Sequence, residues 1–195
     1  YVHYEPRDGL AGSTVYDMCQ DKEGFMWFAT ENGISRYDGT RFRNFTTNDG
    51  LPDNEVLKVF CDSKGRVWIS TFSKFICYYY DGQIYTQEND TILAKLHFKS
   101  NIVTIAEDAE GNVAFCDLSQ IIWIISPDKK VSSIDVYEKD RSNPLRFIAV
   151  YSFDLERKKR LVVAINELSY TLKDRRLNYY YAMTGMKNFY DRRRV

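Results

Sequence analysis

The stretch DGLPDNEVLKVFCDSKGRVWIST, at residues 49–71, repeats a phrase that the chain has already used at residues 8–30, DGLAGSTVYDMCQDKEGFMWFAT. At an offset of 41 residues the two copies share eight identical positions. In the first copy these are Asp8, Gly9, Leu10, Val15, Asp21, Gly24, Trp27 and Thr30, and in the second Asp49, Gly50, Leu51, Val56, Asp62, Gly65, Trp68 and Thr71. Self-similarity at a period of about 40 residues predicts a repeat architecture.

Two weaker copies follow. In NIVTIAEDAEGNVAFCD, Asp108 and Gly111 keep the Asp-x-x-Gly spacing, but Ala114 stands where the tryptophan was. In RFIAVYSFDLERKKRLVVAI the glycine is missing as well, yet Asp154 follows Asp108 by 46 residues, the distance that also separates Asp108 from Asp62. The repeat therefore continues along the chain while its sequence degenerates.

Short apolar or alternating runs bounded by turn residues fill each unit, which indicates strands rather than helices. In the first unit these runs are 14–20, 25–29, 33–37 and 42–46. Four short antiparallel strands in a repeat of about 40 to 46 residues are typical of a β-propeller blade. The sequence thus predicts an all-β protein with about four blades.

The repeats set the predicted boundaries. They place blade 1 at 8–48, blade 2 at 49–91, a degenerate blade 3 at 92–138, a degenerate blade 4 at 139–182, and the start of a further blade or a tail at 183–195. Because HYEPRDGL aligns on NFTTNDGL, Tyr4 takes the place of Phe45. Residues 1–7 are therefore predicted to be the outer strand of a closing blade.

The repeated residues have a predicted structural role. In an Asp-x-x-Gly turn the carboxylate accepts hydrogen bonds from backbone amides, and glycine supplies a positive φ that other residues adopt only at a cost. The tryptophan three residues later is expected to fill the space between neighbouring blades, and the threonine to end the strand. The set is Asp21, Gly24, Trp27, Thr30, Asp62, Gly65, Trp68, Thr71, Asp108 and Gly111.

The composition is that of an ordinary folded protein, with 27 basic and 27 acidic residues and a hydrophobic share of 44%. No apolar run reaches the roughly 18 residues that span a bilayer, and the first residues lack the features of a signal peptide. The cysteines, Cys19, Cys61, Cys77 and Cys116, form no CxxC pair. Free and mostly buried thiols are expected, which favours a reducing compartment without settling it.

No catalytic residue, cofactor or metal site is predicted. The chain contains no GxSxG, P-loop or GxGxxG motif. Its two histidines, His3 and His97, are expected on strands or at the surface, too few for a metal cluster or a catalytic triad. The basic runs at 157–160 and 191–195 fit a hairpin turn and a solvated tail better than a nucleic-acid surface.

The segments VYDMCQDKEGFMWFATENGISRYDG and VLKVFCDSKGRVWISTFSKFICYYYDG, each introduced by DGL, resemble the two-component regulator propeller repeat. The resemblance is specific over residues 8–87 and partial to about residue 171. It implies part of a seven-bladed propeller from the extracytoplasmic or periplasmic sensor region of a bacterial histidine kinase or hybrid two-component system. In that family an immunoglobulin-like domain, a membrane helix and the kinase usually follow, several members respond to oligosaccharides, and many are dimers.

The chain departs from the family pattern in its four blades, its degenerate third and fourth repeats, and its lack of membrane and kinase segments. A truncated part of a larger sensor is therefore expected. If these residues were the whole polypeptide, the open edges of its blades would be expected to pair with another chain. The resemblance implies a module that binds a ligand without transforming it, with an oligosaccharide as the candidate. Signalling would pass through a kinase outside this sequence by a conformational or dimer equilibrium.

Two alternatives stay open. One is a protein-interaction scaffold like the WD40 propellers, whose GH and WD dipeptides are missing here. The other is a propeller glycosidase or lyase, because the Asp, Gly and Trp also resemble the Asp-box turn of sialidases. Glycoside hydrolysis needs two carboxylates across the bond, whereas the acids of this chain mostly occupy repeated turns, namely Asp38, Asp62, Asp81 and Asp108.

The ligand site is predicted from topology. Loops that join the second strand to the third, and one blade to the next, emerge on the same face of a propeller, and binding residues concentrate on such loops. Near Glu31 this face is expected to carry the candidate ligand-binding residues Asn32, Asn54, Ser73, Lys74 and Asn101. Beyond the ligand, the expected partner is a second copy of the sensor, with no nucleic acid and no direct membrane contact.

Overall fold

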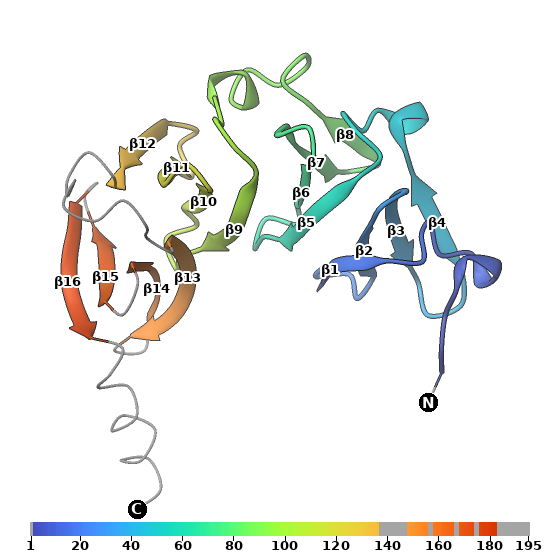
Figure 1. Ribbon diagram of the computed structural model, residues 1–195, viewed down its shortest axis with the longest axis horizontal. Helices are drawn as coiled ribbons and strands as arrows, with labels where there is room; N and C mark the ends of the chain where they lie inside the picture. The colour runs from blue at the N-terminus through green and yellow to red at the C-terminus, as the bar shows by residue number, and fades with distance from the viewer. Residues whose placement is uncertain (1, 137–147, 156–157, 166–167, 174–175, 183–195) are drawn as a thin grey trace, which may run out of the picture. The chain divides into compact units, whose positions relative to one another are not determined.

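The computed structural model shown in Figure 1 describes residues 2–136, 148–155, 158–165, 168–173 and 176–182. Its strands form four four-stranded sheets, and each sheet uses strands that are consecutive in the chain. The all-β propeller fold expected from the repeats is confirmed. Single turns of 3-10 helix precede the first strand at Pro6–Asp8 and lie between blades at Thr47–Asp49 and Leu93–Lys95.

The first two sheets hold the two clear repeats. Blade 1 consists of β1 (Val15–Gln20), β2 (Met26–Thr30), β3 (Gly33–Tyr37) and β4 (Phe42–Phe45). Blade 2 consists of β5 (Val56–Cys61), β6 (Val67–Thr71), β7 (Ile76–Tyr80) and β8 (Gln83–Tyr85). In both blades the register between the first two strands shifts once near the start, between Val15 and Asp17 and between Val56 and Lys58.

The last two sheets hold the degenerate repeats. Blade 3 consists of β9 (Ile102–Glu107), β10 (Val113–Asp117), β11 (Ile121–Ile125) and β12 (Val131–Asp135). Blade 4 consists of β13 (Ile148–Leu155), β14 (Lys158–Ile165), β15 (Leu168–Lys173) and β16 (Arg176–Ala182). The chain divides into two compact units, 1–102 with blades 1 and 2 and 103–195 with blades 3 and 4. The predicted start of a further blade at 183–195 lies outside the described residues.

The core of the first unit lies between its two blades. Strand alternation turns Trp27 and Ala29 of β2 toward blade 2, where they meet Val59 and Val67. Trp27 is 1% exposed, and its ring centroid lies 4.9 Å from that of Tyr79 in blade 2. Burial of a ring this size contributes on the order of 3 kcal/mol, so the tryptophan of the first repeat is a main element of this interface.

The core of the second unit is built without the repeated tryptophan. Ala114 and Cys116 of β10 share one cluster with Val150 and Leu161 of blade 4. The backbone amide of Ala109 also donates to the carbonyl of Lys159 at 2.7 Å. Because Ala114 fills the position of a tryptophan, blade 3 packs on blade 4 through smaller side chains.

Residues 1–7 are the segment predicted to be the outer strand of a closing blade, and this stays a prediction. Residues 2–5 have no regular structure and Pro6–Asp8 is a turn of 3-10 helix, and no strand among the described residues pairs with this segment. Tyr4 instead lies beside Tyr37, with their hydroxyl oxygens 2.6 Å apart, and packs edge-on against Phe42. The segment covers blade 1 with side chains rather than with a ladder.

The expectation of four free thiols is wrong for two of them. Cys19 of β1 and Cys61 of β5 form a disulfide, with their Cα atoms 6.1 Å apart, while Cys77 and Cys116 are free and buried. Sequence spacing could not reveal the pair because the partners lie 42 residues apart on different blades. Disulfides persist in oxidising compartments, so this bond argues against the reducing compartment that the spacing had favoured.

Candidate functional site

The predicted loop residues mostly stabilise the loops themselves. Asn54 accepts a hydrogen bond from the amide of Thr47 at 2.8 Å and so fixes the connection between β4 and β5. Ser73 lies 3.1 Å from the hydroxyl of Thr71 within the turn between β6 and β7. Asn32 and Lys74 are exposed at their hairpin turns, and Lys74 adopts φ 68 there.

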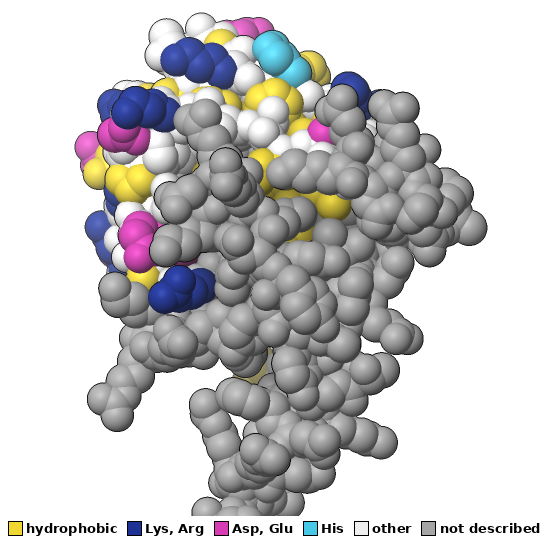
Figure 2. Space-filling view, turned by 90° about the vertical axis from the view of Figure 1, so that its left-hand side faces the viewer, with side chains coloured by type: hydrophobic (Ala, Val, Ile, Leu, Met, Phe, Trp, Pro, Cys, Tyr) yellow, Lys and Arg dark blue, Asp and Glu magenta, His cyan; other side chains and the backbone are white. Residues whose placement is uncertain are grey.

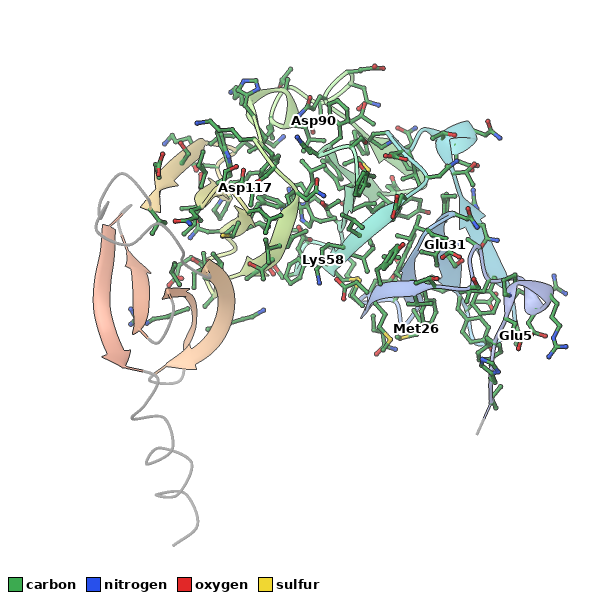
Figure 3. The ribbon with its side chains drawn as sticks, viewed as in Figure 1. Glu5, Met26, Glu31, Lys58, Asp90 and Asp117 are labelled. Carbon is green, nitrogen blue, oxygen red and sulfur yellow. A yellow bond between two sulfur atoms is a disulfide. The ribbon has the colours of Figure 1, made fainter. Side chains whose placement is uncertain are left out.

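Asn101 differs from the other candidates. Its Oδ1 atom is buried and has no hydrogen-bond partner among the residues that the structure describes. Glu31, labelled in Figure 3, is already engaged, because its carboxylate accepts from Ser13 N, Ser13 Oγ and Thr14 N at 2.9 to 3.0 Å. It fixes the approach to β1 and leaves no free acceptor edge for a ligand.

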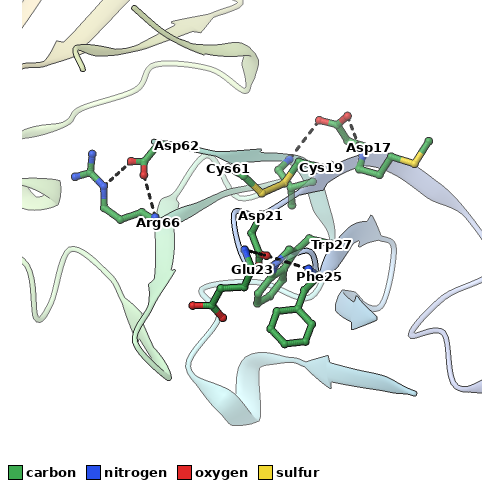
Figure 4. The surroundings of a disulfide bond; sticks show 11 residues. Asp17, Cys19, Asp21, Glu23, Phe25, Trp27, Cys61, Asp62 and Arg66 are labelled. Carbon is green, nitrogen blue, oxygen red and sulfur yellow. Dashed lines mark hydrogen bonds and ion pairs between the residues drawn. A yellow bond between two sulfur atoms is a disulfide. The ribbon is translucent and has the colours of Figure 1, made fainter. Parts of the chain in front are cut away.

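The other end of the strands is organised by the Asp-x-x-Gly turns. Oδ1 of Asp21 accepts from the amides of Glu23 and Phe25, both at 3.0 Å, as Figure 4 shows. Its second oxygen accepts from the indole nitrogen of Trp27 at 2.6 Å, a contact that sequence reasoning missed. The fixed spacing of six residues between Asp and Trp in both clear repeats was its only signal.

These turns border a groove between blades 1 and 2, called the turn groove below. Its volume is about 420 Å³. It is lined by Asp21, Lys22, Glu23, Arg36, Gly65, Val67, Tyr79, Tyr80, Asp81 and Gly82. Both blades supply residues, so the shape of the groove depends on how the two blades pack.

Arg36 is the most constrained side chain of the turn groove. Its guanidinium carbon lies 4.6 Å from the ring centroid of Phe25 and 5.9 Å from that of Tyr79. One of its nitrogens donates to the Tyr79 hydroxyl at 3.2 Å. Among the described residues Arg36 makes no ion pair, so the aromatic rings hold a cation that still has unused donors.

The lining of the turn groove mixes both signs of charge. The Lys22 and Arg36 side chains can donate hydrogen bonds to a ligand, and the Glu23 and Asp81 carboxylates can accept them. Tyr80 presents a ring that is 42% exposed. Charged donors and acceptors beside an aromatic face suit a ligand with many hydroxyl groups, because each hydroxyl can both donate and accept. A strongly charged ligand would meet repulsion from one half of the lining.

A second groove, called the loop groove below, lies at the opposite end of blade 2 and has a volume of about 520 Å³. It is lined by Gly50, Leu51, Pro52, Phe75, Ile76, Ile84, Thr86, Gln87, Glu88 and Asn89. Two of its polar side chains already form hydrogen bonds within the protein. Asn89 donates to the carbonyl of Ile84, and Gln87 donates to that of Leu96. None of the five predicted ligand residues lines either groove.

Two observations concern the metal-binding and nucleophilic side chains of the described part of the chain. It contains no group of three or more His, Cys, Asp and Glu side chains placed to bind a metal ion. Burial raises the pKa of the Cys77 thiol, and burial together with Asp117 raises that of Cys116 to about 12, so neither is a nucleophile at neutral pH. The same residues include no helix long and apolar enough to cross a membrane.

The surface charge is interspersed on the face shown in Figure 2. Basic side chains of the described residues lie there among acidic and apolar ones rather than in one continuous patch. Exposed ion pairs occur in both units, Arg7 with Glu5 in the first and Lys130 with Asp128 in the second. A nucleic-acid surface would require a concentration of basic charge. The basic run at 191–195 lies outside the described residues.

Comparison with solved structures shows the fold. The extracellular domain of the putative hybrid two-component system BT4673 of B. thetaiotaomicron matches 92% of this chain with a TM-score of 0.63 and 22% identity. That of BT3049 matches 88% with a TM-score of 0.60 and 19% identity. Virginiamycin B lyase of Staphylococcus aureus also matches 88%, with a TM-score of 0.63 and 15% identity, so the fold alone does not decide between binding and catalysis.

Sequence comparison identifies the repeats. The chain is 38% identical to Histidine kinase P4 of Formosa agariphila over 48 residues, which are 25% of this chain and 4% of that protein. It spans 25% of the extracellular domain of BT4673 and 22% of that of BT3049. The family model of the two component regulator propeller matches at 9–32 and 50–73, which hold the Asp-x-x-Gly turn and the tryptophan of each of the two clear repeats. These two segments are two-component regulator propeller repeats, and the four sheets of the chain are propeller blades.

Proposed function

We propose that this chain is the ligand-sensing part of an extracytoplasmic two-component signalling protein, which binds a ligand, leaves it unchanged and signals through a kinase elsewhere in that protein. The match of both clear repeats to the regulator propeller carries this proposal. The extracellular domains that share the fold support the location, as does the disulfide between Cys19 and Cys61. A homodimer of the complete sensor, in contact with the membrane only through other segments, belongs to the same proposal.

The ligand proposed is an oligosaccharide, and the turn groove is the site that suits it best. Arg36 offers unused donors, Glu23 and Asp81 offer acceptors, and Tyr80 offers an exposed ring. The loop residues Asn32, Ser73 and Lys74 remain a second proposed surface at the opposite end of the strands. Sugar binding by such groups depends on several weak hydrogen bonds and on ring stacking, so affinities in the micromolar to millimolar range are expected.

Isothermal titration calorimetry with a panel of oligosaccharides tests the proposal. A saturable heat with one member of the panel is expected, and Arg36→Ala should weaken that binding about ten-fold or more by removing the oriented donor. Arg41→Ala is the matched control, because Arg41 is exposed and lines neither groove. Binding that responds equally to both substitutions would place the ligand elsewhere.

One observation favours a second function, a protein-binding surface. Phe72 and Phe75, in the turn between β6 and β7, are 55% and 45% exposed. Two exposed aromatic rings beside the loop groove are typical of an anchor for a protein partner. Substitution of both rings by serine should abolish capture of such a partner, while oligosaccharide binding in the turn groove should remain.

A further inference from the structure

The disulfide between Cys19 and Cys61 joins the first strand of blade 1 to the first strand of blade 2 (Figure 4). It is not part of the repeat. At the offset that superposes the two copies, Cys19 matches Phe60 and Cys61 matches Gln20. The bond is therefore specific to this pair of blades, and the seam between β1 and β5 has acquired a covalent link that the repeat does not require.

The other polar contacts across this seam are few. β1 and β5 belong to different sheets, so they share no ladder of backbone hydrogen bonds. Asp17 accepts from the amide of Val59 at 3.3 Å and lies 3.7 Å from the Lys58 ammonium, and Tyr16 donates to Glu55 at 3.2 Å. Half-exposed contacts of this kind contribute little stability each. We therefore infer that the disulfide and the apolar cluster shared by blades 1 and 2 contribute most of the stability of the contact between β1 and β5.

The seam determines the width of the turn groove. Asp21 follows Cys19 by two residues, and Val67, which lines the groove, is the cross-strand partner of Cys61. The two turns touch, because a Cβ atom added to Gly65 would lie 2.6 Å from Cε of Lys22. Any separation of β1 from β5 therefore moves the opposite walls of the groove apart.

The redox chemistry of the described residues centres on this one bond. Cys77 and Cys116 are fully buried, and their raised thiol pKa values leave no thiolate to attack a disulfide at neutral pH. Cys19 and Cys61 are only half-buried. Of the four cysteines, the two in the disulfide are therefore the more exposed to an external thiolate.

We propose that the Cys19–Cys61 disulfide is a redox-sensitive lock on the seam between blades 1 and 2, and that it holds the turn groove in its binding shape. The reductant is a dithiol. Its first thiolate attacks one sulfur and breaks the S–S bond, forming a mixed disulfide. Its second thiolate then displaces the bound cysteine, so that two protonated cysteines are released and the reductant leaves as a cyclic disulfide oxidised by two electrons. The part of this proposal that concerns ligand binding rests on the proposed function.

The test compares oxidised protein, protein treated with dithiothreitol, and the Cys19→Ser/Cys61→Ser variant with and without dithiothreitol. Closing a loop of 42 residues predicts that reduction lowers Tm by about 5 to 15 °C. Amide hydrogen exchange at 21–25 and 62–67 should accelerate on the order of ten-fold. Dithiothreitol should change nothing further in the double variant, which controls for effects of the reagent elsewhere.

Three results would overturn the lock. Four titratable thiols in the unfolded, untreated protein would show that the bond is not formed. A lower Tm with unchanged amide hydrogen exchange at 21–25 and 62–67 would show that the disulfide stabilises the whole fold without affecting the turn groove. Equal oligosaccharide affinity before and after reduction would remove its control of binding while leaving the proposed function intact. Faster exchange together with no binding by any oligosaccharide would instead support the lock and contradict the proposed function.

Discussion

The turns of blades 1 and 2 share their Asp, Gly and Trp residues but differ in the donors that bind the aspartate. Asp21 is half-buried and its Oδ2 accepts from Trp27 alone, whereas Asp62 is 4% exposed and its Oδ2 accepts from Trp68 at 2.8 Å and from Nε of Arg66 at 2.6 Å. Arg66 also stacks over the Trp68 ring, with its guanidinium carbon 4.6 Å from the ring centroid. Blade 1 has Phe25 at the same offset and hence no such cation.

Blade 3 extends this comparison. There Oδ1 of Asp108 accepts from the amide of Asn112 at 2.8 Å, and its Oδ2 accepts from the side chain of the same residue, also at 2.8 Å. The amide four residues after the aspartate thus donates to its Oδ1 in all three blades, while the second oxygen takes whichever donor the repeat provides. A degenerate repeat keeps its turn because the aspartate needs a donor and not specifically a tryptophan.

The largest effect is expected from Asp62→Ala compared with Asp21→Ala. Removal of Asp62 leaves the Arg66 guanidinium, whose side chain is 16% exposed, and the Trp68 N–H without their acceptor, which should cost about 3 to 5 kcal/mol of unfolding free energy. Asp21→Ala should lower the unfolding free energy by about 1 to 2 kcal/mol. The substitution leaves one indole N–H and two turn amides without their acceptor, but these groups lie near solvent. Urea unfolding followed by tryptophan fluorescence measures both.

The control for this pair is Asp62→Ala combined with Arg66→Met. Removing the cation together with its acceptor should recover a large part of the loss, because the uncompensated buried charge is gone. Equal losses for Asp62→Ala and Asp21→Ala would show that the difference in burial between the two turns has no energetic consequence.

A smaller effect is expected from Asn112→Ala in blade 3. The substitution removes one hydrogen bond between neutral and charged groups and leaves the backbone amide bond to Asp108 in place, so a loss of about 1 kcal/mol is expected. Asn112→Asp is the sharper variant, because it places a second carboxylate beside Asp108 and should cost more. A tolerated aspartate would contradict the donor role given to this position.

The smallest effect concerns the opposite end of the strands, where the blades also differ. Glu31 of blade 1 ties down residues 13–14 with its carboxylate, while its counterpart Phe72 in blade 2 uses only its backbone amide, which donates to the carbonyl of Glu55 at 2.8 Å. Burial pushes the pKa of Glu31 upward, but hydrogen bonds from its own backbone, Thr14 and Ser13 outweigh burial and lower the pKa overall.

Because its folded pKa is lowered, Glu31 contributes stability that is fully present above its unfolded pKa of about 4.3 and is lost as pH falls through the folded value. Glu31→Gln should therefore cost about 1 kcal/mol at pH 7 and progressively less below about pH 4. Unfolding of wild type and variant across pH 3 to 7 measures this difference. A difference that grows on acidification would contradict the assignment, and Glu23→Gln, at an exposed turn position, is the matched control.

The fold could be predicted from the sequence because each turn of the repeat requires particular residue types at fixed positions. Asp, Gly and Trp at fixed spacing reveal the turn, and alternating apolar residues reveal the strands that follow it. Contacts between repeats left no such signal. Cys19 and Cys61 occupy unmatched positions of the two copies, and Arg36 meets Phe25 and Tyr79 only once two blades have packed together.

The candidate site was accessible only in part for the same reason. Topology predicts which loops share a face, but it cannot show that the Asn54 side chain already accepts a hydrogen bond from the amide of Thr47. The turn groove depends on the seam between blades, where the side chains of one repeat meet those of the next. Its lining therefore had to come from the structure.

We propose that this propeller binds a ligand without changing it. Calorimetric titration of the oxidised protein with the oligosaccharide panel, followed by mass spectrometry of each sugar after prolonged incubation, tests this proposal. We expect saturable binding of one sugar, weakened by Arg36→Ala, and recovery of that sugar at its original mass. Cleavage products that form with wild type and disappear with a carboxylate substitution would contradict it and assign the propeller to an enzyme.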